Sequence, residues 1–119
     1  MLRKIDCVMV SVPDLDAATD FYRRVFGLRP KWRDDVSVGL GLPESDTEIV
    51  LHTLDLPPDC AVNYLVDDVP AAVAAYAEAG CSVRQAPFDI AVGQCAVVED
   101  PYGNAVCVLD LRRTRTPNL

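Results

Sequence analysis

The chain has 119 residues, half of them apolar, and a formal net charge of −7. This length and composition indicate one globular domain and exclude an intrinsically disordered chain. The negative charge argues against nucleic-acid binding, since the one basic cluster is Arg112, Arg113 and Arg115 in the tail. The apolar runs are too short for a membrane span, and the N-terminus lacks the apolar core of a signal peptide. We therefore expect a cytoplasmic protein without a membrane or nucleic-acid partner.

The first half of the chain predicts a strand, a helix and three further strands. Residues 5–12 alternate between strongly apolar and other side chains, which indicates a strand that ends at Pro13. Asp14 is suited to cap a helix over residues 15–26, and Gly27 to stop it. The expected strands that follow are 29–35, 36–42 and 47–54, with a turn at 43–46. In the second of these strands Gly39 and Gly41 leave one face nearly bare.

The same pattern returns in the second half of the chain. A strand at 61–66 is followed by a helix at 69–79 and by Gly80, and Tyr76 takes the place of Tyr22. A repeat at about half the chain length predicts two similar modules. Further strands are expected to begin at Cys81–Arg84 and to cover 94–99 and 105–111. We predict an α+β fold of two β-α-β-β-β modules, at 4–55 and 61–111, with a linker at 56–60 and a tail at 112–119.

Several short motifs follow one another in a fixed order. They are Asp14-Leu15, Phe21-Tyr22, Phe26-Gly27-Leu28, Val66-Asp67-Asp68-Val69, Gly80 and Asp100-Pro101-Tyr102-Gly103-Asn104. In this order, and with the internal repeat, the chain resembles the vicinal oxygen chelate superfamily. That group includes glyoxalase I, bleomycin-resistance proteins and extradiol dioxygenases. The resemblance implies a single domain over residues 1–119, with two sheets curled around a cavity, and a homodimer.

The resemblance also implies where metal ligands would stand. The first ligand, usually His, falls on Cys7, its equivalent in the second module on Ala61, and the last, usually Glu, on Cys107. The remaining ligand comes from the strand 47–54, where the register leaves Leu51 and His52 as alternatives. Alanine cannot ligate, so we predict no metal or other cofactor. The alternative is an unusual Zn site made by Cys7, His52 and Cys107.

The predicted ligand-binding residues are those expected to face the cavity: Cys7, Met9, Ser11, Trp32, His52, Asn63 and Cys107. Trp32, together with Phe88 and Tyr102, has the flat ring needed to stack on a ligand, and Asn63 has the amide needed to orient one. For the aromatic residues the alternative is ordinary core packing. The five cysteines lack Cys-x-x-Cys spacing, which favours reduced, buried thiols.

His52 is the single histidine and therefore the candidate general base. The alternative is a strand-end histidine that makes a local hydrogen bond. These observations favour a protein that binds a small molecule without the usual metal centre. The first alternative is an enzyme, either a glyoxalase-like lyase or isomerase or a dioxygenase, with an unusual or relocated metal site. The second is a structural or regulatory homodimer without a ligand.

Overall fold

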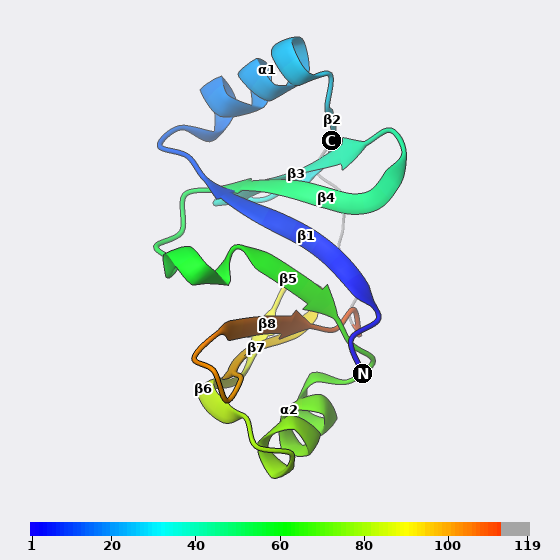
Figure 1. Cartoon of the computed structure of the whole chain (residues 1–119). Coiled ribbons are helices and arrows are strands. Elements are labelled where there is room, and N and C mark those ends of the chain that lie inside the picture. Colours follow the sequence, from blue (N-terminus) through cyan, green and yellow to red (C-terminus); the bar gives the residue numbers. More distant parts are fainter. Residues whose placement is uncertain (113–119) are drawn as a thin grey trace. The chain divides into compact units, whose positions relative to one another are not determined.

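The computed structural model describes residues 1–112 and contains two compact units (Figure 1). The N-terminal unit is Asp6–Leu56. The C-terminal unit combines Met1–Ile5 with the described residues from Pro57 onward. Within residues 1–112, neither helix has the length and apolar character that a membrane span requires. The predicted tail, at 112–119, lies outside the described residues except for Arg112.

The N-terminal unit is a four-stranded sheet with one helix on one of its faces (Figure 1). Its strands lie in the order β2-β3-β4-β1, where β1 and β4 are parallel and the other neighbours antiparallel. In chain order the elements are β1 (Lys4–Ser11), α1 (Leu15–Phe26), β2 (Arg29–Arg33), β3 (Ser37–Leu42) and β4 (Ser45–His52). The first two residues of β1 belong to the other unit.

Helix α1 begins and ends where the sequence predicts. The Asp14 side chain accepts a hydrogen bond from the backbone N–H of Ala17 at 3.1 Å, which satisfies a donor that the helix leaves open. Gly27 ends the helix in the left-handed region, at φ 70°, where a side chain would be strained. The helix packs on a core of buried residues from both helix and sheet: Leu15, Leu28, Val38, Leu40 and Leu51.

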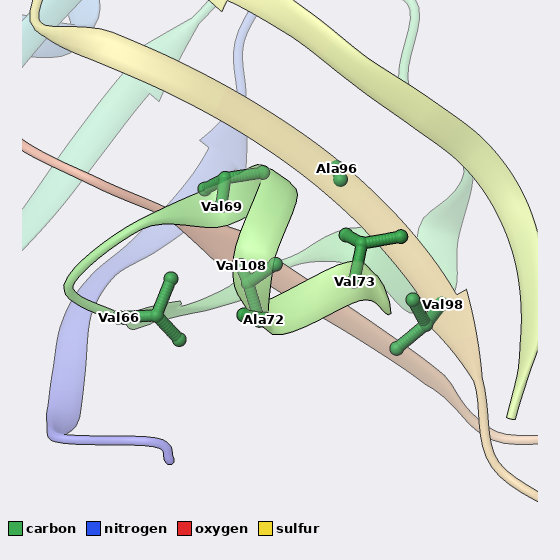
Figure 2. Close-up of a cluster of buried hydrophobic side chains, with 7 residues drawn as sticks. All are labelled: Val66, Val69, Ala72, Val73, Ala96, Val98 and Val108. Atoms are coloured by element: carbon green, nitrogen blue, oxygen red, sulfur yellow. The ribbon is translucent and has the colours of Figure 1, made fainter. Parts of the chain in front are cut away.

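The C-terminal unit repeats this plan. Its strands lie in the order β5-β8-β7-β6, with β5 and β8 parallel and the other neighbours antiparallel. The elements are a short 3-10 helix η1 (Pro58–Cys60), β5 (Val62–Leu65), α2 (Val69–Glu78), β6 (Ser82–Ile90), β7 (Gly93–Glu99) and β8 (Ala105–Leu109). Figure 2 shows the core between α2 and this sheet: Val66, Val69, Ala72, Val73, Ala96, Val98 and Val108.

Two aspartates hold the N-terminus of α2. The Asp68 side chain accepts from the N–H of Ala71 at 3.0 Å, as a cap of the kind seen in α1. Asp110, which follows β8 and has no exposed surface, accepts from the N–H of Val69 at 2.8 Å and from the N–H of Gln94 at 2.8 Å. Its carboxylate thus joins the helix to the sheet by two charge-assisted hydrogen bonds.

Each unit has the order β-α-β-β-β, so the predicted α+β class and the module plan are confirmed. Some predicted strand bounds are wrong. Strand β4 begins at Ser45, inside the predicted turn, because Leu42 pairs with Ser45 and only two residues make the turn. Strand β6 runs on to Ile90 through Pro87, which an edge strand tolerates because its outer side needs no N–H donor.

Candidate functional site

Strand register in the N-terminal unit decides which side chains face away from α1. Strands β1 and β4 pair with Val10 opposite Leu51 and Ser11 opposite His52. Val10 and Leu51 pack in the core beneath α1, where Leu51 is fully buried. Because side chains alternate along a strand, His52 lies on the other face of the sheet, with Ser11. The choice that the sequence left open between Leu51 and His52 is therefore resolved, and His52 is the one that faces away from the helix.

This face also carries two predicted sulfur-containing residues. Cys7 and Met9 belong to the same alternating set as Ser11, and the Cys7 Sγ lies 3.9 Å from the Met9 Sδ. Cys7 is 5% exposed, whereas Ser11 lies at the exposed end of β1. Four of the seven predicted ligand-binding residues thus share one face of a single sheet.

Trp32 extends from β2 across β3 on this face. A Cβ atom at Gly39 would collide with the indole ring, and a Cβ atom at Gly41 would lie 2.8 Å from the Cδ of Lys31. The two glycines therefore provide the space that the Trp32 and Lys31 side chains occupy. This accounts for the nearly bare strand face seen in the sequence. The indole Nε1 donates a hydrogen bond to the Glu48 Oε1 at 2.8 Å, which fixes the orientation of both side chains.

Glu48 is a residue that the sequence pattern did not single out. It lies in β4, in register with Cys7, and its side chain is 20% exposed. Its second oxygen, Oε2, lies 3.7 Å from the Lys31 Nζ. Alternation within β4 places Glu48 on the face of His52, so it could have been found once the register was known. We name this surface the Glu48 face and define it by Cys7, Met9, Ser11, Trp32, Glu48 and His52.

His52 is 3% exposed, and its Nδ1 accepts a hydrogen bond from the backbone N–H of Leu54 at 3.1 Å. This is the local hydrogen bond expected of a strand-end histidine. Burial lowers the pKa of His52 below its ordinary value of 6.5, because a charged imidazole loses its hydration there. At neutral pH the ring is therefore neutral. Since Nδ1 is an acceptor, the proton is assigned to Nε2.

The two remaining predicted residues lie in the C-terminal unit. Asn63 in β5 pairs in register with Cys107 in β8. Tyr64, the neighbour of Asn63, packs against the core beneath α2, so Asn63 and Cys107 face away from that helix. Both are buried, at 8% and 2% exposure. Asn63 therefore faces away from α2, as the alternation in the sequence predicted, and its contact with a ligand stays a prediction.

Cys107 lies beside another buried thiol, that of Cys60. It packs with Cys60 and Val97 in a small buried cluster. Burial, together with a hydrogen bond to the Cys60 thiol, raises the pKa of Cys107 far above its ordinary value. Burial also raises the pKa of Cys95 to about 11. Both thiols are therefore protonated at neutral pH, which disfavours a thiolate ligand.

The metal-ligand positions implied by the resemblance do not fit its His and Glu donor set. Position 61 is an alanine, without a donor atom, and position 107 is a protonated, buried thiol. Across residues 1–112, no three His, Cys, Asp or Glu side chains are grouped closely enough to hold a metal ion. Of the predicted Zn candidates, Cys7 and His52 belong to one unit and Cys107 to the other.

The other two aromatic residues with a predicted stacking role lie outside the Glu48 face. Phe88 is in the edge strand β6 of the C-terminal unit and is 36% exposed. Tyr102 is in the turn between β7 and β8 and is 86% exposed. Among the described residues of the N-terminal unit, Trp32 is therefore the aromatic residue of the Glu48 face.

Comparison with known proteins supports the fold. The sequence model of the Glyoxalase/Bleomycin resistance protein/Dioxygenase superfamily matches residues 4–108. A methylmalonyl-CoA epimerase in complex with methylmalonyl-CoA and NH4+ has a similar structure, with a TM-score of 0.73 and 17% identity over 98% of this chain and 100% of that chain. No curated protein sequence matches this chain.

Two further solved structures have the same fold. A variant of Streptomyces coelicolor methylmalonyl-CoA epimerase with 2-nitronate-propionyl-CoA has a TM-score of 0.73 and 17% identity, over 98% of this chain and 100% of that chain. The hypothetical protein BH1468 from Bacillus halodurans C-125 has a TM-score of 0.71 and 14% identity, over 97% of this chain and 98% of that chain. The family match covers most of the chain and agrees with its two β-α-β-β-β units. The chain therefore belongs to the glyoxalase, bleomycin resistance protein and dioxygenase superfamily.

Proposed function

We propose that this protein binds a small organic molecule on the Glu48 face, by stacking on Trp32 and by a hydrogen bond to the Glu48 carboxylate. The observation that carries the proposal is the Trp32 indole, which lies over Gly39 and is fixed there by its hydrogen bond to Glu48. A large aromatic ring held in place against a bare strand can stack on a flat ligand at little entropic cost.

The polar partners on this face support such a role. A carboxylate has about four acceptor sites, and the Trp32 N–H uses one of those on Glu48. A ligand donor can therefore reach Glu48 without displacing the indole. Cys7 and Met9 add polarizable, apolar contact beside the carboxylate. The curling of the two sheets around a cavity, with Asn63 and Cys107 as further contacts, stays a prediction.

The experiment uses Trp32 as its own reporter, since it is the single tryptophan of the chain. Intrinsic fluorescence is followed while the protein is titrated with methylmalonyl-CoA, coenzyme A and a set of flat heteroaromatic acids and amides. A saturable change is expected for at least one compound, and its affinity should fall about tenfold or more in Glu48→Gln. Glu44→Gln, at an exposed glutamate in the turn before β4, is the matched control. Unchanged fluorescence and melting temperature with every compound would contradict the proposal.

A second candidate is an isomerase or lyase in which Glu48 removes a proton next to a carbonyl group. It is favoured by the half-buried carboxylate on the Glu48 face and by the similarity in fold to epimerases. A carboxylate held within reach of an acidic C–H is a competent general base. Its test is the exchange of the α-proton of methylmalonyl-CoA for deuterium in D2O. Exchange that is lost in Glu48→Gln but kept in Glu44→Gln would establish it, and exchange at the uncatalysed rate would exclude it for this substrate.

We also propose that the protein acts as a homodimer. The support comes from the family resemblance and from the size of the chain, because a small domain gains buried apolar area by pairing with a copy of itself. Light scattering at micromolar concentration tests this directly. A mass of two chains is expected, and the mass of one chain would be decisive against it.

A further inference from the structure

Three thiols of the C-terminal unit gather on the sheet face that points away from α2. Cys107 in β8 and Cys60 at the end of η1 are buried and in the same cluster. Cys95 in β7 lies on the same face, opposite Leu109. Two of these thiols, those of Cys60 and Cys107, pack together with Val97 in one small buried cluster, which places them near each other.

The Cys60 thiol also has a polar route to solvent. Its Sγ lies 3.9 Å from the Oδ1 of Asp59, whose side chain is 54% exposed. The other oxygen of Asp59 accepts from the Arg84 Nη1 at 2.9 Å, so the carboxylate is held next to the thiol. Cys60 is thus the member of the pair that connects the buried cluster to the surface, whereas Cys107 lies behind it.

We propose that Cys60 and Cys107 are a redox pair that forms a reversible intramolecular disulfide when the protein meets hydrogen peroxide. The Cys60 sulfur attacks one peroxide oxygen, the O–O bond breaks, and the released hydroxide takes the proton of the Cys60 thiol to become water. Cys60 is then a sulfenic acid. The Cys107 sulfur attacks the Cys60 sulfur, the S–O bond breaks and the S–S bond forms. The proton of Cys107 leaves with that hydroxide as a second water.

This balance is complete. The two thiols lose two electrons and two protons in total, and the peroxide gains them as two molecules of water. A dithiol reductant reverses the step by thiol–disulfide exchange. Because burial raises the pKa of Cys107, the second step, in which its sulfur attacks Cys60, is slow at neutral pH, and formation of the disulfide should become faster as pH rises.

The other cysteines are poorly placed to compete with Cys60 for Cys107. Cys95 and Cys107 are diagonal neighbours on antiparallel strands, and such Cβ atoms are farther apart than the about 4 Å of a disulfide. Cys81 packs against the core beneath α2, on the other side of this sheet. Cys7 belongs to the N-terminal unit. The pairing is therefore expected to be specific.

The disulfide would join the segment leading into β5 to the middle of β8. Cys107 is the register partner of Asn63 in β5, so the bond would fasten η1 beside that residue. We expect the oxidised protein to melt at a higher temperature than the reduced protein, because a cross-link between distant residues restricts the unfolded chain.

The test treats the folded full-length protein with hydrogen peroxide or with buffer alone, then denatures it in excess alkylating agent. The reduced protein should carry five alkyl groups, one per cysteine. The oxidised protein should carry three and should have lost two hydrogens. Peptide mapping should recover Cys60 linked to Cys107, and a dithiol reductant should restore five alkyl groups.

Three variants make the result specific. Cys95→Ala should still lose two alkylation sites, whereas Cys60→Ser and Cys107→Ala should lose none through a disulfide. Cys60→Ser changes the less buried partner and so keeps the test informative if Cys107→Ala unfolds. Five alkyl groups after peroxide, linkage of Cys95 to Cys107, or sulfinic acid at Cys60 without linkage would each overturn the proposal.

Discussion

The carboxylate of Asp110 lies 2.8 Å from the backbone N–H of Val69, the first residue of α2. The two residues are far apart in sequence, and the bond is fully buried. A helix N-terminus has open N–H groups and a partial positive charge, both of which a carboxylate satisfies. Asp110 therefore anchors α2 on the sheet, in a way that the surface cap Asp68 does not.

The first prediction concerns this anchor. Asp110→Ala should lower the free energy of unfolding by about 3 kcal/mol or more, because it removes the partner of the buried Val69 N–H and of the partly buried Gln94 N–H. Asp68→Ala should cost only about 1 kcal/mol, since the N–H of Ala71 that it caps is exposed to water. Urea unfolding of both variants measures the difference. Equal costs would mean that Asp110 has no special role.

The second prediction concerns the space beneath the indole. Gly39→Ala should move the Trp32 ring, break its hydrogen bond to Glu48 and cost about 1–3 kcal/mol of stability. Gly41→Ala is the matched control, because its Cβ would crowd only the flexible side chain of Lys31 and would lie at an ordinary 3.6 Å from the Arg29 carbonyl oxygen. Fluorescence emission of the single tryptophan reports the movement. A change in both variants, or in neither, would contradict our account of the two glycines.

The third prediction concerns pH. The pKa of His52 is lowered by folding, so between that value and about 6.5 the unfolded chain binds the proton and the folded chain does not. The contribution of His52 to the free energy of unfolding is therefore fully present above about pH 6.5 and is lost as pH falls from there through the lowered pKa of the folded state. Urea unfolding at pH 7.5 and pH 5.5 should show the loss. His52→Gln, which retains an acceptor for Leu54, should remove most of the difference, and an unchanged pH dependence would refute this assignment.

The fourth prediction concerns an exposed ion-pair network. Arg84 donates to Asp59 at 2.9 Å and also contacts Glu99, and all three side chains are partly exposed. Arg84→Met should therefore lower the free energy of unfolding by no more than about 1 kcal/mol. The same variant should alter the rate of peroxide oxidation of Cys60, because it releases the Asp59 carboxylate beside that thiol. Alkylation of samples taken at timed intervals after peroxide addition measures that rate. An unchanged rate would show that Asp59 does not influence the thiol.

The local features of this chain were determined by its sequence. Asp14 and Gly27 bound α1 and Asp68 begins α2, because caps act through neighbouring backbone groups. The alternating valines and the repeated order of elements determined the two modules and the helix-facing strand faces. The motifs between Asp14 and Asn104 were sufficient to predict the family.

Tertiary structure decided what depends on register and on distant partners. A shift of one residue in β4 exchanges its two faces, so no local pattern could choose between Leu51 and His52, or place Glu48 beside Cys7. The contact of Trp32 with Glu48 crosses a whole strand, and that of Cys60 with Cys107 joins the two ends of a module. Such contacts are set by how the strands pair, because the packing of the sheet, and not the sequence around each residue, brings them together.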